Sequence, residues 1–174
     1  LTIGHFLESL TDYAVTGSEP GISSVIVDSR ETIPASLFVA LPGEHVDGHD
    51  YVAAAFENGA IAALIERPIP GNHVTIDARQ PITESLTFSR NQRTCILVNN
   101  TEKAMQDAAQ AWRNRFTVKV IGVTGSVGKS STKELIYSVL SQRYRTFKTP
   151  GNRNSVLGLP PALFALRPYH QRAV

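Results

Sequence analysis

The 174-residue chain contains a single cysteine, Cys95, so it cannot form an intrachain disulfide. A lone cysteine fits a reducing compartment, and its place in the apolar run 95–98 indicates a small, buried hydrophobic side chain. No apolar stretch approaches the roughly 20 residues of a membrane-spanning helix. The first residues also lack the pattern of a signal peptide. These absences predict a cytoplasmic protein that does not insert into a membrane.

The chain also has no large excess of positive or negative charge. Lysine and arginine number 17, and aspartate and glutamate number 15, which gives a formal net charge of +2. The positive residues look scattered along the sequence, so a nucleic-acid partner is not expected. The hydrophobic share of 42% is ordinary for a soluble protein and suffices for the core of one compact domain or two small ones.

Helical and strand patterns alternate along the chain, which predicts an α/β fold. Residues 67–94 are rich in Pro, Thr, Ser, Asn and Arg and predict a long irregular excursion. Asp50 is expected to cap the second helix, and Gly59 to follow its end. We predict helices over 1–10, 50–58, 101–116, 130–143 and 155–166, and strands over 25–27, 37–41, 60–66, 73–77, 95–99, 118–124 and 145–149.

A glycine-rich segment stands between the strand predicted over 118–124 and the helix that follows. Glycines at 125 and 128 let successive backbone N–H groups face one centre, and the helix N-terminus adds further donors and a partial positive charge. Lys129 supplies a cation for β- and γ-phosphates, and the Ser130 hydroxyl is placed to ligate Mg²⁺. The strict phosphate-loop pattern needs a glycine at position 123, where this chain has valine.

The loop therefore predicts binding of a nucleoside triphosphate together with Mg²⁺. Lys129 and Ser130 are the predicted catalytic residues, with Ser130 as the metal ligand. The predicted ATP-binding residues are Thr124, Gly125, Ser126, Val127, Gly128, Lys129, Ser130 and Ser131.

Several further motifs accompany this variant loop. They are residues 27–30 (Val-Asp-Ser-Arg), 36–43 (Ser-Leu-Phe-Val-Ala-Leu-Pro-Gly), 47–51 (Asp-Gly-His-Asp-Tyr), 59–60 (Gly-Ala), 148–154 (Lys-Thr-Pro-Gly-Asn-Arg-Asn) and 158–160 (Gly-Leu-Pro). Together with Thr-Gly-x-x-Gly-Lys, and in this order, they resemble the Mur ligase superfamily, the ATP-dependent amide ligases of peptidoglycan synthesis. The first half is similar to the amino-terminal domain of the MurE and MurF branches, and the residues after the loop are similar to MurF.

This resemblance implies an activity and a domain organisation. The activity is ATP-dependent addition of D-alanyl-D-alanine to UDP-MurNAc-tripeptide through an acyl phosphate, in the bacterial cytoplasm. Residues 1–100 would form a small mixed-sheet domain that binds the UDP-MurNAc-peptide, and residues 101–117 a connecting helix. Residues 118–174 would begin a central P-loop domain with a parallel sheet. Because complete family members have three domains, we expect a monomeric fragment that does not ligate by itself.

The resemblance also assigns residues to the substrates. Those matched to the UDP end are Ser29, Arg30, Glu44, His45, Val46 and Asp47. Asn152 and Asn154 match the asparagines of a Gly-Asn-x-Asn loop near the reacting carboxylate. Three features depart from the family pattern. Serines at 130–131 replace a threonine pair, valine stands at 127 in place of a small polar residue, and Ser-Val at 155–156 replaces an Asn and an acidic residue. The last departure bears on contacts with the acceptor.

Alternatives stay open at this point. The polar group His45, Asp47, His49 and Asp50 could ligate a metal, although a turn that touches UDP fits it better. Asp28 and Arg30 could form a local ion pair instead of contacting a ligand. The whole chain could belong to a MurE-type ligase that adds the third amino acid, to a non-catalytic UDP-sugar-peptide-binding module, or to an unrelated P-loop kinase or GTPase.

Overall fold

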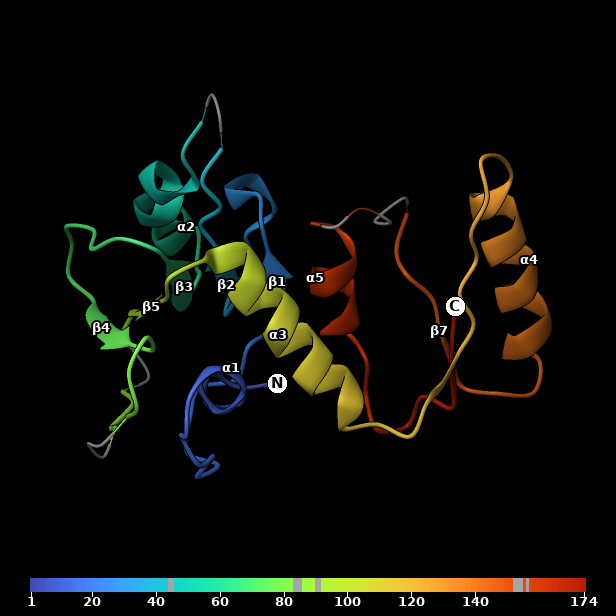
Figure 1. Ribbon diagram of the computed structural model, residues 1–174, viewed down its shortest axis with the longest axis horizontal. Helices are drawn as coiled ribbons and strands as arrows, with labels where there is room; N and C mark the ends of the chain where they lie inside the picture. Colours follow the sequence, from blue (N-terminus) through green and yellow to red (C-terminus); the bar gives the residue numbers. More distant parts are fainter. Residues whose placement is uncertain (44–45, 83–85, 90–91, 152–154, 156) are drawn as a thin grey trace. The chain divides into compact units, whose positions relative to one another are not determined.

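The computed structural model describes residues 1–43, 46–82, 86–89, 92–151, 155 and 157–174 (Figure 1). The chain divides into two compact units, residues 1–109 and residues 110–174. The boundary falls inside helix α3 (Thr101–Asn114), which confirms the amphipathic helix expected there. Each unit has a sheet of its own, so the expected α/β class is confirmed.

The first unit is built on a five-stranded sheet. Its strands, in the spatial order β1-β2-β3-β5-β4, are β1 (Val25–Ile26), β2 (Leu37–Val39), β3 (Ala62–Ile65), β5 (Thr94–Leu97) and β4 (Val74–Asp77). Every described strand pair in it is parallel, so the expectation of a mixed sheet was wrong. The reason lies in the connections between strands. Each one crosses over and returns the chain to the end of the sheet at which the previous strand began, so consecutive strands run in the same direction.

The three central strands are apolar because both of their faces are covered. All residues of β2, β3 and β5 are buried, as expected for strands inside a parallel sheet. Strand β4 at the sheet edge buries Ile76 and exposes Val74 and Thr75. Cys95 lies in this core with no exposed surface, which confirms the prediction of a buried small side chain.

One short helix precedes the strands of this unit, and further short helical segments follow β1 and β2. Helix α1 (Ile3–Leu10) begins at Thr2, whose side chain and backbone exchange hydrogen bonds with His5 in a capping box. The segments η1 (Ser29–Glu31) and η2 (Gly48–Tyr51) are 3₁₀ turns, and η2 leads directly into α2 (Val52–Glu57). The predicted cap at Asp50 was wrong. Asp47 caps η2, because helical structure starts earlier than the apolar pattern indicates.

The residue after α2 has a conformation that demands glycine. Gly59 has a φ of +107°, and a Cβ there would lie 3.2 Å from the Cα of Pro34. The prediction that glycine follows the end of this helix is therefore confirmed.

The second unit carries a three-stranded parallel sheet in the order β6-β8-β7. Its elements are β6 (Lys119–Val120), α4 (Lys129–Ser141), β7 (Thr146–Phe147), α5 (Leu159–Leu163) and β8 (Arg172–Ala173). Val118, Leu166 and Ala173 form its buried centre, with Phe147 and Leu163 packed against them. Strand β8 was not predicted, since two residues are too few to show a period.

Helix α4 has an unusual surface for an amphipathic helix. Only Lys133 is buried among its residues, while Leu135 and Val139 are 68% and 72% exposed. The apolar face expected on this helix is thus only partly covered, since Ile136 and Leu140 are half-buried.

Candidate functional site

The loop between β6 and α4 has the backbone that the sequence predicts. Gly125 has a φ of +147° and Gly128 a φ of +80°, both in a region that L side chains rarely adopt. A Cβ at Gly128 would meet nothing within 4 Å, so conformation rather than crowding calls for glycine there. Gly128 is also the N-cap of α4 and makes no side-chain cap hydrogen bond. The N-terminus of a helix favours anionic ligands, because its N–H groups and its dipole present positive charge there.

Lys129 and Ser130 are the first two residues of α4. The Nζ atom of Lys129 donates a hydrogen bond to the carbonyl of Gly125, within its own loop. The ammonium therefore lies against the loop that it is predicted to serve, and it can exchange this carbonyl for a phosphate oxygen. Val127, predicted to bind ATP, is 91% exposed at the tip of the loop.

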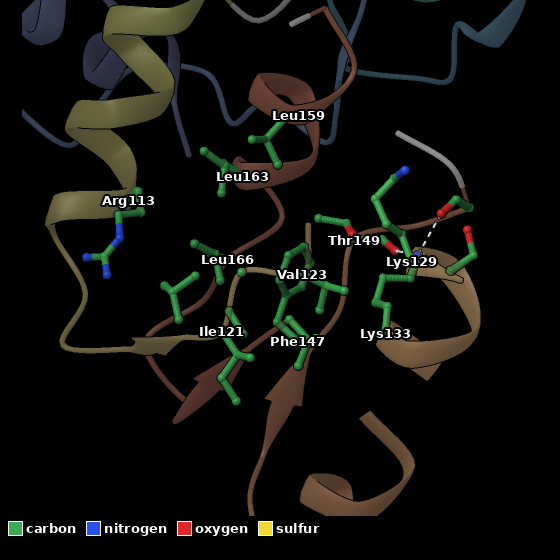
Figure 2. A pocket seen from close by; sticks show the side chains of 16 residues that line it. Arg113, Ile121, Val123, Lys129, Lys133, Phe147, Thr149, Leu159, Leu163 and Leu166 are labelled. Carbon is green, nitrogen blue, oxygen red and sulfur yellow. Dashed lines mark hydrogen bonds between the residues drawn. The ribbon is translucent and has the colours of Figure 1, made fainter. Parts of the chain in front are cut away.

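A cavity of about 430 Å³ opens beside the phosphate loop (Figure 2). Lys129 and Lys133 lie at one end and Arg113 at the other, and most of the side chains between them are apolar (Figure 2). Its lining residues are Arg113, Val120, Ile121, Gly122, Val123, Lys129, Ser130, Lys133, Phe147, Thr149, Gly151, Leu159, Leu163, Leu166, Ala173 and Val174. Of the predicted ATP-binding residues, only Lys129 and Ser130 line this cavity.

Lys133 is a site residue that the sequence analysis missed. Its Nζ donates to the carbonyls of Thr149 and Gly151, at 2.8 and 2.6 Å. The available signal was its spacing, because a residue four positions after Lys129 lies on the same helix face.

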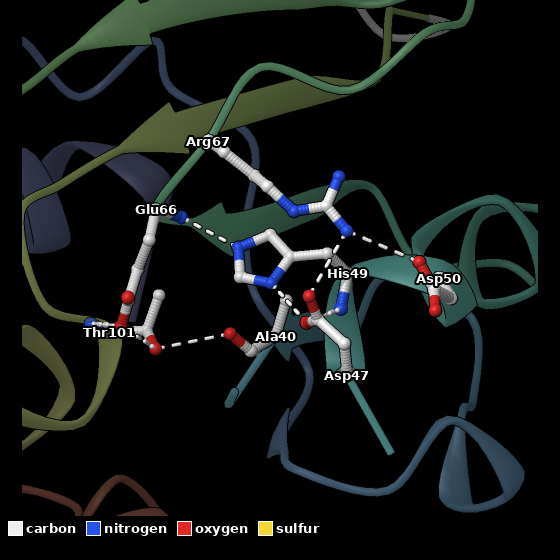
Figure 3. Close-up of polar contacts among 7 residues, drawn as sticks. All are labelled: Ala40, Asp47, His49, Asp50, Glu66, Arg67 and Thr101. Atoms are coloured by element: carbon white, nitrogen blue, oxygen red, sulfur yellow. Dashed lines mark hydrogen bonds and ion pairs between the residues drawn. The ribbon is translucent and has the colours of Figure 1, made fainter. Parts of the chain in front are cut away.

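A second polar cluster lies where the parallel strands of the first unit end (Figure 3). The backbone N–H of Glu66 donates to Nε2 of His49 at 2.8 Å, so Nδ1 carries the proton and donates to Asp47 at 2.6 Å. The ring is buried, with its side chain only 2% exposed. Hydrogen bonds from the backbone and the ring of His49 lower the pKa of Asp47 to about 2, which keeps this carboxylate charged.

The same cluster joins the segments that follow three strands, β2, β3 and β5. Arg67 bridges Asp47 and Asp50 at 3.1 and 3.2 Å. The Oε1 atom of Glu66 accepts from both the N–H and the hydroxyl of Thr101, at 2.7 and 2.9 Å. Helix α3 is thereby anchored to the end of β3 (Figure 3). In parallel sheets, ligands bind outside the carboxyl ends of the strands, which is where this cluster lies.

Asp28 and Arg30 form the local ion pair that was one of the two interpretations. Their side chains are 2.6 Å apart, and Asp28 also caps η1 through the Arg30 N–H. These bonds to Arg30 lower the pKa of Asp28 to about 2. Asp77 and Arg79 repeat the arrangement after β4 at 2.6 Å, a feature that the sequence analysis did not single out. The Arg30 guanidinium remains exposed, at 87% of its side chain, so pairing leaves it accessible to an anion.

Some predicted residues fall outside the described part of the chain. They are Glu44, His45, Asn152 and Asn154. Ser29 and Arg30 lie in η1, while Val46 and Asp47 directly precede η2. Among the residues that the structure describes, no group of three or more His, Cys, Asp or Glu side chains could hold a metal ion. His49, Asp47 and Asp50 bond instead to the backbone and to Arg67.

The charges are distributed very unevenly between the two units. Residues 110–174 contain eleven lysines and arginines and one acidic residue, Glu134, whereas residues 1–109 contain six basic and fourteen acidic residues. The formal charges are therefore +10 and −8, which add to the total of +2. The description of the positive residues as scattered was wrong. The net charge of the whole chain is small only because the positive second unit offsets the negative first unit. An excess of cations in the unit that contains the phosphate loop favours anionic ligands.

Comparison with known proteins assigns the family. Residues 21–113 match the Mur ligase family, catalytic domain, and residues 123–174 match the Mur ligase middle domain. The chain belongs to the Mur ligase family. The second match begins two residues before Gly125 and includes the whole phosphate loop.

Relatives of this Mur ligase chain point to the MurF branch. It is 40% identical over 154 residues to the UDP-N-acetylmuramoyl-tripeptide–D-alanyl-D-alanine ligase of Treponema pallidum, covering 87% of the chain and 31% of the relative. A MurF structure from Acinetobacter baumannii superposes with a TM-score of 0.74 and 31% identity, covering 98% of the chain and 34% of that structure. The MurF ligase of Thermotoga maritima in complex with ADP has a TM-score of 0.63 and 30% identity, with coverages of 87% and 31%.

The Mur ligase chain thus spans about a third of the length of the relatives that it matches. No helix in the described ranges combines the length and the apolar character needed to cross a bilayer.

Proposed function

We propose that this chain is the substrate- and nucleotide-binding part of a MurF-type ligase. The ligase would use ATP to join D-alanyl-D-alanine to UDP-MurNAc-tripeptide. The observation that carries the proposal is the phosphate loop, with Gly125 and Gly128 at positive φ and with Lys129 and Ser130 on one cavity, in a chain of the Mur ligase family. MurF-like relatives with the same substrates in their names support the choice of branch.

The chemistry follows from the weakness of a carboxylate as an acyl donor. A carboxylate oxygen of the tripeptide attacks the γ-phosphorus of ATP, ADP leaves, and an acyl phosphate forms. The amine of D-alanyl-D-alanine then attacks the acyl carbon, and phosphate departs with the bonding electrons. The enzyme has to neutralise the γ-phosphate and hold the carboxylate in line with it.

The described residues fit the first of these tasks. The N–H groups from Gly125 to Ser131 would cradle the phosphates, helped by the positive end of a 13-residue helix. Lys129 would turn from the Gly125 carbonyl to a phosphate oxygen. Ser130 would ligate Mg²⁺, which supplies further neutralisation of phosphate charge when it is bound.

The first unit would hold the UDP end of the substrate. Arg30 is exposed in η1 and Val46 is 57% exposed before η2, both beyond the carboxyl ends of parallel strands. With Ser29 and Asp47, and with Glu44 and His45, they form the proposed UDP-binding set. Asn152 and Asn154 are proposed to contact the reacting carboxylate.

The domain limits given by the sequence belong to the same proposal. They are residues 1–100 for UDP-MurNAc-peptide binding, 101–117 for the connecting helix, and 118–174 for the start of the ATP-binding domain. A monomer in the bacterial cytoplasm completes the proposal, since ATP and UDP-linked precursors are available there. Sedimentation analysis would test the oligomeric state.

The proposal is tested by measuring phosphate release from ATP by the full-length enzyme. It requires release that depends on UDP-MurNAc-tripeptide and on D-alanyl-D-alanine, with loss of release in Lys129→Met and near-normal release in Lys119→Met, an exposed lysine of β6. Release that depends on a dipeptide substrate and a diamino acid would favour a MurE-type ligase instead. Substrate binding without release would favour a non-catalytic binding module.

A further inference from the structure

The ammonium group of Lys133 is buried inside the cavity beside the phosphate loop. Its side chain is only 11% exposed, and its nearest described carboxylate oxygen, on Glu134, lies 3.9 Å away. Glu134 is itself bonded to Lys148. Lysine is almost never buried without partners, because a charge loses its hydration there. The two carbonyls that Lys133 bonds are therefore its main compensation in the described structure.

These two carbonyls belong to one short segment that lies beside α4 at the lysine end of the cavity (Figure 2). Lys133 donates to the carbonyl of Thr149 at 2.8 Å and to that of Gly151 at 2.6 Å. Thr149 is held on its other side as well, because its N–H donates to the carbonyl of Val174 at 3.0 Å. Gly151 has a φ of +50°, so the chain turns sharply where Lys133 holds it.

Lys129 and Lys133 lie on one face of α4 but bond different parts of the chain. Lys129 bonds within the phosphate loop, to Gly125, whereas Lys133 bonds outside this loop, to Thr149 and Gly151. Both line the same cavity, one helical turn apart. Lys129 therefore bonds the phosphate loop itself, whereas Lys133 connects the helix that follows this loop to residues 149–151.

We propose that Lys133 is a positioning residue that fixes residues 149–151 against the start of α4 and so sets where the acyl substrate meets the phosphate loop. This inference rests on the proposed ligase function. The held segment runs directly into position 152 of the chain, the first of the two asparagines assigned to the reacting carboxylate. Phosphoryl transfer requires the carboxylate oxygen to lie within about 3–3.5 Å of the γ-phosphorus, and a misplacement of about 1 Å can lower the rate about a hundredfold.

The test compares Lys133→Met, Lys133→Arg and Lys148→Met in the full-length enzyme. Lys133→Met keeps the length and the apolar stem but removes both hydrogen bonds. We expect it to lower kcat/KM for UDP-MurNAc-tripeptide about tenfold to a hundredfold. The dissociation constant for ADP, measured by calorimetry, is expected to change by less than about twofold. A guanidinium can also donate to two carbonyls, so Lys133→Arg should recover most of the loss.

Lys148→Met is the matched control. Lys148 bonds Glu134 and lies 4.5 Å from the centre of the Tyr137 ring, outside the set of cavity-lining residues. We expect its kinetic constants to stay near those of the unsubstituted enzyme.

Three results would overturn the role of Lys133. One is an unchanged kcat/KM in Lys133→Met, and another is an equal loss of ADP binding and of tripeptide turnover. The third result serves if Lys133→Met does not fold. It is full turnover by Lys133→Arg combined with faster hydrogen exchange at the Thr149 amide. Turnover would then not require residues 149–151 to be fixed. An unsubstituted enzyme that binds ADP but adds no D-alanyl-D-alanine would contradict the proposed function itself. This result differs from failure of the Lys133 role because it is observed without any substitution.

Discussion

The Nε2 atom of His49 accepts a hydrogen bond of 2.8 Å from the backbone N–H of Glu66, seventeen residues further along the chain. This bond joins the turn after β2 to the end of β3. The opposite ring nitrogen donates to Asp47, so each nitrogen of a buried imidazole has one fixed partner. The ring thereby holds in place η2, which directly follows Val46 and Asp47, two of the residues proposed to bind UDP.

Replacing His49 with leucine should destabilise the first unit. The Glu66 N–H would lose its acceptor inside the protein, and an unsatisfied buried donor costs about 1–3 kcal/mol. Chemical denaturation of the chain measures this loss. His73→Leu is the control, since His73 makes a ring contact with Phe56 at 6.1 Å but does not join strand ends. Equal stability of the two variants would contradict the structural role of His49.

Acid should destabilise the amino-terminal segment through Glu19. Burial alone would raise the pKa of this carboxyl, but hydrogen bonds from the Thr16 backbone and the Tyr13 hydroxyl outweigh it and hold the pKa at about 2, below the ordinary value of 4.5. A lowered pKa means that the carboxylate stabilises the fold above about pH 4.5 and that this contribution is lost as the pH falls toward 2.

The measurement is the free energy of unfolding between these two pH values. Glu19→Gln removes the titrating group, so its stability should fall less steeply with acid than that of the unsubstituted chain. The exposed Glu57 provides the control as Glu57→Gln, which should keep the original slope. Parallel pH curves for Glu19→Gln and the unsubstituted chain would refute the assignment.

Alanine at Gly128 should strain the phosphate loop. The φ of +80° is unfavourable for an L side chain by about 1–2 kcal/mol, although a Cβ would meet no atom within 4 Å. Gly21→Ala is the control, because Gly21 has no positive φ, has open space around its Cβ position, and is not among the residues that line the cavity. We expect Gly128→Ala to lower both thermal stability and nucleotide affinity, and Gly21→Ala to leave both nearly unchanged.

Cys95 should resist alkylation in the folded protein. Burial raises the pKa of its thiol to about 12, and the thiolate is the reactive form. Iodoacetamide labelling, followed by mass spectrometry, should therefore proceed only through unfolding and speed up with denaturant. Rapid labelling of the native chain at neutral pH would show that β5 is accessible.

Much of the phosphate loop could be predicted because its requirements are local. The glycines, Lys129 and Ser130 act within one loop and one helical turn, so their spacing in the sequence already expresses their geometry. The same holds for Asp28 and Arg30, which are two residues apart and form the ion pair that was one of the alternatives. Buried strands such as β3 and β5 were visible as apolar runs.

The sequence by itself therefore determined the class of fold, the phosphate loop and the resemblance to the Mur ligases. Only the tertiary structure decided that the described strands of the first unit are all parallel, and that its boundary with a strongly cationic second unit lies within α3. It also decided that Lys133 bonds to Thr149 and Gly151, sixteen and eighteen residues away. Such contacts arise from how distant segments pack, and a pattern with a period of two or 3.6 residues carries no record of them.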